Sequence, residues 1–320
     1  MMKQERVSNG RAWLPGFFCE DSDLTMDKQS VRDLVAGYSI ETTVREAARL
    51  DRYADLVPTG TAMYIPHVPG VAREDTIALA ARLRREGMDP VPHVVARRTE
   101  SATVLDDFLK RLVGEAGVTR VLVVAGDIDK PEGEFESALQ IIERGFIEKH
   151  GIRKVGLACH PEGHKNVADD ALRDAIVRKN AYAQKTGSDV YLVSQFGFVA
   201  DPIIGWETST TSINKLPYYA GLPGLATTKT LLKYALDCGV GPSLAAFSKH
   251  ATQLSKLLTV SAPDNQVVDL ARHRRQHPAS TLKGLHFFPF GGLKRTSDWL
   301  KKLADGEFEF TSDGTGLEVA

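Results

Sequence analysis

The chain has 320 residues, of which 42% are hydrophobic and 25% charged, a composition ordinary for a soluble globular protein with a sizeable core. Forty basic and 41 acidic residues give a formal net charge of −1, so no overall field attracts nucleic acid or an anionic membrane. Three widely spaced cysteines, Cys19, Cys159 and Cys238, argue against a zinc ribbon or a disulfide framework and favour a reducing compartment. The N-terminus lacks an apolar core of signal-peptide length, and the aliphatic runs are too short to span a membrane. We therefore expect a soluble, unprocessed, cytoplasmic protein.

Short runs rich in β-branched and aromatic residues recur along the chain and predict eight strands. In chain order they are 38–41, 61–66, 91–96, 120–126, 154–159, 189–196, 216–221 and 284–290. Longer segments with apolar residues at helical spacing lie between them, for example 73–87, 101–117, 134–151 and 167–187. Several of these segments close with Gly, which commonly ends helices.

The regular alternation predicts a parallel sheet with helical crossovers, and eight units favour a closed (β/α)₈ TIM barrel over an open doubly wound sheet. No Gly-x-Gly-x-x-Gly follows the first strand, which counts against a Rossmann domain. Extra helices are expected between strands seven and eight, near 227–238, 242–258 and 264–277. We expect residues 1–35 to be an N-terminal extension, 36–310 the catalytic barrel, and 311–320 a frayed C-terminal tail.

Polar residues collect at the predicted carboxyl ends of the strands, where barrel enzymes carry their chemistry. Glu41 ends strand one, His93 lies in strand three, Gly126 and Asp127 end strand four, and Gln195 ends strand six. Each has a structural alternative: Glu41 could cap a helix near Thr43, and Gly126 with Asp127 could make a turn. Their repeated placement favours a ligand site.

Strand five leads into the stretch VGLACHPEGH at 155–164, which offers a thiol, two imidazoles and a carboxylate. A metal site or a Cys-His nucleophilic pair is disfavoured, because the side chains of Cys159 and His160 would point to opposite faces of a strand. We expect no metal, and interpret the segment as a loop that lines a ligand.

Four motifs in this order and spacing resemble the methylenetetrahydrofolate reductase family, over roughly residues 37–305. They are Ser39-Ile40-Glu41, Gly126-Asp127, Pro161-Glu162-Gly163-His164 and Gln195-Phe196-Gly197-Phe198. The resemblance implies a (β/α)₈ barrel that binds FAD and works by a ping-pong mechanism. NADH or NADPH would reduce the flavin, and the reduced flavin would pass hydride to 5,10-methylenetetrahydrofolate, giving 5-methyltetrahydrofolate in one-carbon and methionine metabolism.

The resemblance also implies roles for individual residues. Glu41 matches the general acid that opens the folate five-membered ring, and Asp127 matches the charge that stabilises the resulting cation. Gln195 and Phe198 match positions that bind the substrate, together with Asp127. Residues in positions that line the flavin are His93, Ala125, Gly126, Asp127, His160, Glu162 and His164. Thr61 is a further match, for which Thr59 and Tyr64 compete, and Lys179 matches a phosphate contact if its helix carries about one extra turn.

The chain departs from the family pattern in several places. Thr42-Thr43-Val44-Arg45 replaces an aromatic-proline run, Ala125 stands where an arginine is usual, His160 replaces a tyrosine, and Gly197 replaces an aromatic residue. The direction of the reaction stays open. Two alternatives also remain: a folate-binding or methyl-transfer barrel without redox activity, and a flavin barrel with another substrate or a protein electron donor. A homodimer is the expected oligomer.

Overall fold

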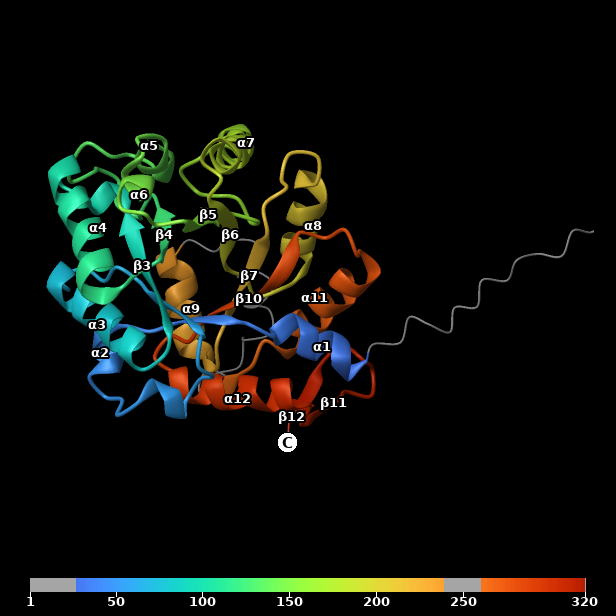
Figure 1. Ribbon diagram of the computed structural model, residues 1–320. Coiled ribbons are helices and arrows are strands. Elements are labelled where there is room, and N and C mark those ends of the chain that lie inside the picture. Colours follow the sequence, from blue (N-terminus) through green and yellow to red (C-terminus); the bar gives the residue numbers. More distant parts are fainter. Residues whose placement is uncertain (1–26, 239–259, 320) are drawn as a thin grey trace, which may run out of the picture.

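The computed structural model describes residues 27–238 and 260–319, which form a (β/α)₈ barrel ringed by helices (Figure 1). Eight parallel strands close in the order β1-β10-β7-β6-β5-β4-β3-β2, so the eight predicted strands and the barrel are confirmed. The strands are β1 (Ser39–Glu41), β2 (Ala62–Ile65), β3 (Asp89–Val95), β4 (Arg120–Val124), β5 (Lys154–Cys159), β6 (Asp189–Phe196), β7 (Tyr218–Pro223) and β10 (Leu282–Phe288).

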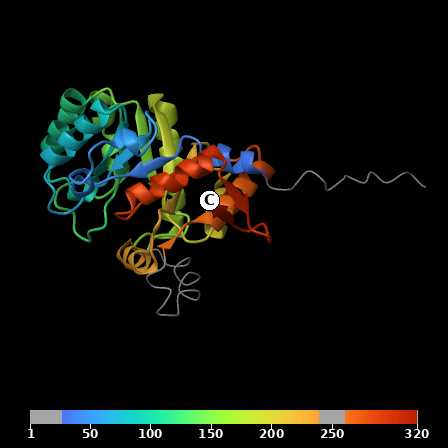
Figure 2. The ribbon, with the colours of Figure 1, turned by 90° about the horizontal axis from the view of Figure 1, so that it is seen from below.

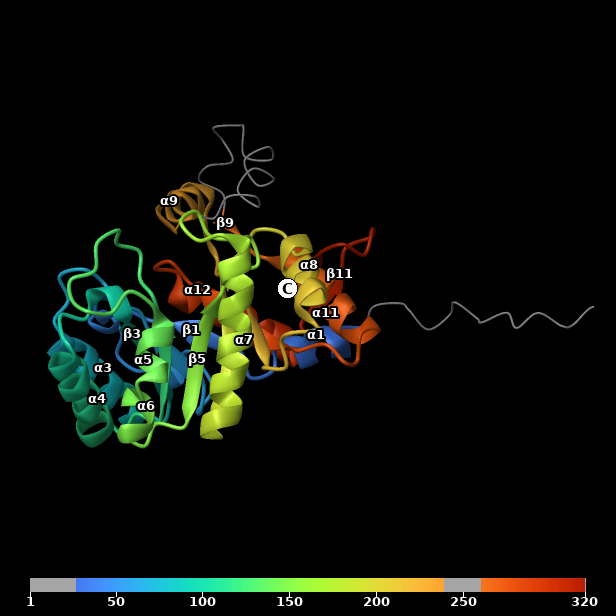
Figure 3. The ribbon, with the colours of Figure 1, turned by 90° about the horizontal axis from the view of Figure 1, so that it is seen from above.

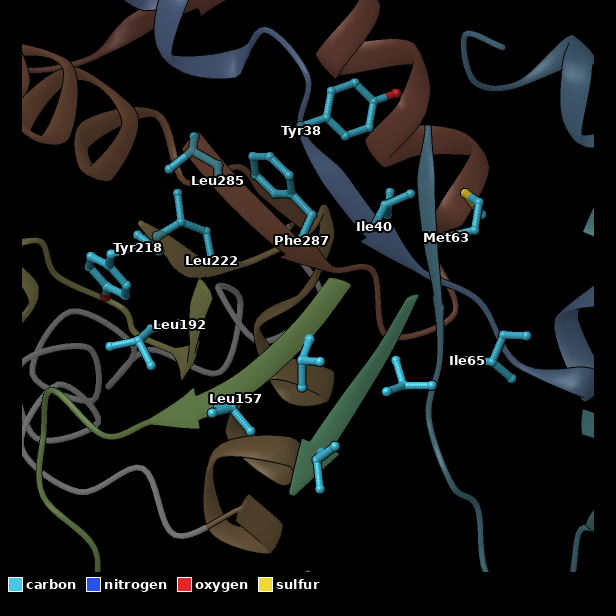
Figure 4. Close-up of a cluster of buried hydrophobic side chains, with 14 of the residues drawn as sticks. Tyr38, Ile40, Met63, Ile65, Leu157, Leu192, Tyr218, Leu222, Leu285 and Phe287 are labelled. Carbon is cyan, nitrogen blue, oxygen red and sulfur yellow. The ribbon is translucent and has the colours of Figure 1, made fainter. Parts of the chain in front are cut away.

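The main core lies between the barrel wall and the surrounding helices. Alternate side chains of each strand point outward, and these are mostly aliphatic or aromatic. Three neighbouring strands, β2, β1 and β10, contribute fully buried examples: Met63, Ile40, Leu285 and Phe287 (Figure 4). Burying this layer supplies the main driving force for closing the barrel.

A smaller cluster fills the barrel interior. Its largest members, Tyr64 and Tyr191, join their hydroxyl groups at 2.8 Å across the barrel. Gly156 makes this possible, because a Cβ at that position would lie 2.9 Å from the Tyr191 ring. The interior is therefore a packed plug, and a ligand must bind above it.

Helices cover the outside of the barrel, and their ends follow local capping rules. In α4 (Ala102–Ala116) the Ser101 hydroxyl accepts a hydrogen bond from Val104 N, and Gly117 ends the helix at φ 59°. The other helices are α1 (Lys28–Val35), α2 (Val44–Ala47), α3 (Arg73–Arg85), α5 (Ala138–Glu143), α6 (Phe146–Lys149), α7 (Asp169–Thr186), α8 (Asp201–Thr210), α9 (Thr228–Cys238), α11 (Asp264–Gln276) and α12 (Leu293–Asp305), with 3₁₀ turns η2 (Tyr53–Asp55) and η3 (Ala96–Arg98).

One predicted helix is wrong in its extent. The segment 134–151 forms two short helices, α5 and α6, because Gly145 between them adopts φ 76° and interrupts the helical path. The remaining predicted helices between strands agree closely with α3, α4 and α7.

Of the extra helices predicted between strands seven and eight, α9 and α11 are confirmed, and the one near 242–258 lies outside the described residues. Helix α9 stands at one end of the barrel, apart from the ring of outer helices (Figures 2 and 3). It packs on aromatic residues from the ends of β6 and β10, which places it beside the carboxyl ends of the strands. Short antiparallel strands β8 (Ala226–Thr227) and β9 (Val260–Ser261) accompany it.

Both described ends of the chain pack against the barrel. Residues 28–35 of the expected extension form α1, which buries Val31, Leu34 and Val35 against the core, while residues 1–26 lie outside the described part. The expectation of a frayed tail is wrong: β12 (Leu317–Val319) pairs with β11 (Phe308–Phe310) in an antiparallel ribbon, and Leu317 is buried.

Within the described ranges, no helix is both long and apolar enough to cross a lipid bilayer.

A buried carboxylate, Glu207 of α8, ties together the amino-terminal end of β10. Its Oε2 lies 2.6 Å from His273 Nε2 of α11, and its Oε1 accepts hydrogen bonds from Ser280 Oγ and Thr281 N at 2.6 Å and from Leu282 N at 3.3 Å. Burial acts to raise the pKa of Glu207, but the hydrogen bonds from Ser280, His273 and Thr281 outweigh it and hold that pKa below its ordinary value.

We predict that Glu207→Gln lowers the free energy of unfolding by about 3 kcal/mol at pH 7, the upper scale for losing hydrogen bonds to a buried charged acceptor. Because the native pKa is depressed, this contribution is present above the unfolded-state pKa and disappears as pH falls through the native value. Denaturant unfolding at several pH values measures it. As a control, Glu143→Gln removes the exposed pair with Arg178 and should cost under about 1 kcal/mol. Equal effects of the two variants would contradict the assignment.

Candidate functional site

A buried carboxyl group, that of Glu41, occupies the carboxyl end of β1. Its Oε1 lies 3.7 Å from the Nε2 atoms of both His93 on β3 and His286 on β10. The Glu41 side chain is 14% exposed. Burial raises the pKa of Glu41 to about 7, an increase that the nearby His93 partly offsets. A carboxyl group of this kind is protonated in a substantial fraction of molecules at neutral pH and can act as an acid.

The two histidines beside Glu41 are neutral at physiological pH. Burial lowers the pKa of His93 to about 4, partly opposed by Glu41, and burial lowers the pKa of His286 to about 3. Neither Nε2 atom has a hydrogen-bond partner among the described residues. Buried polar atoms without partners are rare, and here both are directed at the same carboxyl group. The arrangement therefore offers hydrogen-bonding positions to a ligand above the barrel plug.

Strand register fixes the orientation of His286. Ser39 lies opposite His286 in the β1–β10 pair, and the Ser39 hydroxyl meets His286 Nδ1 at 2.8 Å. The Tyr64 ring packs against the His286 ring with centroids 4.3 Å apart. The sequence analysis did not single out His286. The signal was a histidine within the apolar strand 284–290, two residues from Phe288 and therefore on the same face.

The prediction that Thr61 lines the cofactor is wrong, because Thr61 lies at the opposite end of β2 from Glu41. It precedes the strand at its amino-terminal end, where its hydroxyl donates to Pro58 O at 2.7 Å. The β2 residue in register with Glu41 is Tyr64, three positions further along the strand. Of the competing positions considered from the sequence, Tyr64 is therefore the one that lies beside the site.

At the end of β4, Ala125, Gly126 and Asp127 form part of the rim. Gly126 adopts φ 101°, and a Cβ there would lie 2.6 Å from Val95 Cγ1, so this turn against β3 requires glycine. The Asp127 side chain is 80% exposed, and its Oδ1 pairs with Arg98 Nη2 at 3.1 Å. Asp127 therefore lies at the solvent-facing rim with its charge countered, and Glu41 lies in the interior.

The loop after β5 carries the histidines of CHPEGH. The His160 and His164 rings meet edge to face at 5.1 Å, and burial, with Lys179 and His164 adding to it, lowers the pKa of His160 to about 3. Cys159 is buried, and burial raises the pKa of its thiol well above the ordinary range, so it is not an activated nucleophile. In the described part of the chain, no three His, Cys, Asp or Glu side chains gather as metal ligands.

Lys179 does not reach the rim as a phosphate contact would. It lies on α7 with 7% exposure, and its Nζ donates to Ala158 O at 2.5 Å. Burial lowers the pKa of its ammonium group. The position of this lysine therefore does not support its predicted role, because its ammonium group is turned toward the backbone of β5.

Two predicted residues at the end of β6 differ in accessibility. Gln195 is exposed, and its Oε1 accepts a hydrogen bond from Phe196 N at 3.2 Å. Phe198 is 5% exposed and packs on Phe196, in the aromatic cluster beneath α9. Gln195 is thus accessible to solvent at the strand end, and the Phe198 ring belongs to the packing.

The missing aromatic side chain at Gly197 has a local reason. A Cβ at position 197 would lie 3.2 Å from Glu162 Oε1. The Glu162 carboxylate, from the loop after β5, therefore occupies the space into which a larger residue at 197 would project.

No protein-family model matches the chain. Among solved structures it is similar to an uncharacterised protein from Clostridium thermocellum that binds two copies of 5-methyl-5,6,7,8-tetrahydrofolic acid, with a TM-score of 0.52 and 12% identity over 84% of this chain and 97% of that one. It is also similar to tryptophan synthase subunit alpha from Legionella pneumophila, with a TM-score of 0.41 and 11% identity over 88% of this chain and 98% of that one. The first likeness supports the barrel fold.

We predict that Glu41→Gln changes the pH dependence of stability. The native pKa of Glu41, about 7, lies above the ordinary 4.5, so its burial costs nothing at low pH and increasingly destabilises the native state as pH rises toward 7. The wild type should match the variant at pH 4 and be less stable by up to about 3 kcal/mol at pH 8. Paired denaturant titrations measure this. A constant difference between the two proteins across this range would show that the carboxyl pKa is not raised.

Proposed function

We propose that the protein interconverts 5,10-methylenetetrahydrofolate and 5-methyltetrahydrofolate, with FAD as bound cofactor and a nicotinamide as electron donor. The observation that carries the proposal is the Glu41 carboxyl group, which has a pKa of about 7 and is buried beside two imidazoles whose Nε2 atoms lack a hydrogen-bond partner among the described residues. It lies at the end of the barrel where enzymes of this fold carry their chemistry.

The reaction needs an acid at this place. The five-membered ring of methylenetetrahydrofolate must open to an iminium cation before its exocyclic carbon accepts hydride, and the leaving nitrogen then requires a proton. A carboxyl group whose pKa lies near the working pH is protonated often enough to donate and acidic enough to transfer the proton. Glu41 meets both conditions, and in the reverse direction its carboxylate would take the proton back.

The two histidines support this role because they are neutral. A cationic imidazole 3.7 Å from Glu41 would stabilise the carboxylate and lower its pKa. Neutral His93 and His286 leave the pKa of Glu41 raised, and their Nε2 atoms provide polar contacts for a heterocycle.

The residues at the ends of β3, β4 and β5 carry chemical groups of the types that bind a flavin. His93 offers a ring nitrogen without a hydrogen-bond partner among the described residues, Gly126 has no side chain at the rim, and His160 and His164 lie at the next strand end. Because the cluster around Tyr64 and Tyr191 fills the barrel interior, a flavin would lie over the strand ends and not inside the barrel. When bound there, FAD would supply the hydride chemistry that protein side chains lack.

Asp127 could stabilise the iminium cation only after its pair with Arg98 opens. Because Asp127 is 80% exposed, the pair is screened and weak, and opening it costs little. The proposed electrostatic role of Asp127 therefore belongs to the ligand-bound protein.

A folate-binding or methyl-transfer barrel without redox activity is the second candidate. It is favoured by the Clostridium thermocellum protein, a barrel of similar fold whose known ligand is 5-methyltetrahydrofolate. That likeness supports a folate ligand for this chain under both candidates, so the flavin decides between them.

We predict that the purified protein is yellow, or becomes so with FAD, with absorbance at about 450 nm as expected of a flavin-dependent hydride-transfer enzyme. The reduced protein, mixed anaerobically with methylenetetrahydrofolate, should regain this absorbance. A colourless protein that FAD cannot reconstitute would reject the redox function and leave the folate-binding one. A flavoprotein that methylenetetrahydrofolate cannot reoxidise would reject the assigned substrate.

We predict that Glu41→Gln leaves the reduction of flavin by NADH near the wild-type rate and slows the folate half-reaction by about 10²-fold or more, because only the second step needs the proton. Stopped-flow measurement of each half-reaction tests this. Glu46→Gln is the matched control: burial, with a smaller contribution from the charge of Glu41, also raises the pKa of Glu46, but its carboxyl accepts hydrogen bonds from the backbone of Thr43 and Leu293. Equal slowing of both half-reactions by Glu41→Gln would make Glu41 structural.

A further inference from the structure

Arg97 follows β3 and lies directly beside the end of β4. Its backbone N donates to Ala125 O at 2.8 Å, so the side chain starts next to the position where the family resemblance leads us to expect an arginine. The guanidinium group then crosses to the segment after β4. Its Nη1 donates to Ile128 O and Asp129 O, and its Nε to Glu136 O, all at 3.0 Å.

These contacts hold the guanidinium group in place without cancelling its charge. Carbonyl oxygens are neutral acceptors, and Arg97 takes part in none of the ion pairs found among the described residues. Its neighbour Arg98 differs, since Asp127 and Glu132 lie 3.1 and 3.5 Å from its guanidinium nitrogens. Of two adjacent arginines at the rim, one is neutralised by carboxylates and the other keeps its full charge.

The charge of Arg97 extends toward the loop after β5. Burial lowers the pKa of His164, and the charges of Lys165 and Arg97 lower it further. His164 in turn contacts His160. The segments that follow β3 and β5 thus carry a guanidinium group held by backbone carbonyls and two imidazoles in mutual contact, which are groups that bind phosphate oxygens.

We propose that Arg97 binds the diphosphate of the dinucleotide cofactor, supplying from the β3 loop the positive charge that Ala125 cannot supply from β4. This inference rests on the proposed function, because it names which group of FAD the rim recognises. It also accounts for the inward-turned Lys179, whose ammonium group is occupied by Ala158 O and is not needed at the rim. Arginine suits this role, because its planar fork can donate to phosphate while other N–H groups hold backbone carbonyls.

The test compares FAD with riboflavin, which has the same ring system and no phosphate. Dissociation constants are measured by quenching of flavin fluorescence for the wild type, Arg97→Gln, Arg97→Lys and the control Arg73→Gln. Arg73 carries the same charge at the nearby start of α3, but Glu100 already pairs with it. Circular dichroism and thermal unfolding confirm that each variant is folded.

We expect Arg97→Gln to weaken FAD binding by about 10-fold or more, the scale of one charged hydrogen bond, and riboflavin binding by less than about 2-fold. Arg97→Lys should fall between, and the effect on FAD should shrink at high salt. Arg73→Gln should change neither.

Equal weakening of FAD and riboflavin by Arg97→Gln would overturn the inference and make Arg97 a support for the 128–136 loop. An unchanged FAD affinity would also overturn it while leaving the proposed function intact. A wild-type protein that binds neither flavin would reject the proposed function itself, and the inference with it.

Discussion

The candidate site depends on one register, that of β1 against β10. It pairs strands 247 residues apart and sets Ser39 opposite His286, whose ring the Ser39 hydroxyl then orients toward Glu41. The same strand β10 is fixed at its other end by Glu207, which accepts the backbone N–H of Leu282. The start of β10 thus contacts a carboxylate of lowered pKa, Glu207 of α8, and its far end lies beside a carboxyl group of raised pKa, Glu41 of β1. The two carboxyl groups differ because Glu207 accepts hydrogen bonds from several donors, whereas Glu41 accepts none from the described residues and lies 3.7 Å from the nearest imidazole nitrogens.

Protonation states follow from this difference in surroundings. Burial without donors favours the neutral form of Glu41, and burial equally favours the neutral forms of His93 and His286. Three titratable groups can therefore share a small space without a net charge, which avoids the cost of desolvating an ion pair. Proton donation by Glu41 would create one buried negative charge, and the positive charge on an opened folate ring is of the sign that would stabilise it. The site is thereby suited to a reaction that makes both charges in one step.

Sequence reasoning succeeded where local pattern decides the outcome. The eight strands were predictable because each is a short β-branched run between helical segments, and Glu41 and His93 were found because they end or interrupt such runs. It failed where contacts between residues far apart in the sequence determine the position of a side chain. His286 becomes part of a site only when the barrel closes, Thr61 fell at the wrong end of β2 because the strand boundary was uncertain by a few residues, and Lys179 turns inward because Ala158 O is within reach. The break at Gly145 shows that a glycine inside a helical pattern can end a helix when the chain adopts positive φ.

Arg97 and Arg98 are adjacent at the rim but differ in their hydrogen-bond and ion-pair partners. Arg97 and Arg98 share a short 3₁₀ turn, yet their side chains leave it in different directions, one toward carbonyl oxygens and the other toward carboxylates. An arginine paired with exposed carboxylates adds little to the local potential, whereas one solvated only by carbonyls retains its attraction for anions. The position of Asp127 depends on Arg98, because a ligand that binds the Asp127 carboxylate at the barrel mouth must first break its ion pair with Arg98. On the proposal that Arg97 binds the cofactor diphosphate, the two arginines would act on different groups, since their guanidinium groups have no acceptor in common among the described residues. Under the proposed function, one arginine of the rim would anchor the cofactor, and the other would hold or release the Asp127 carboxylate.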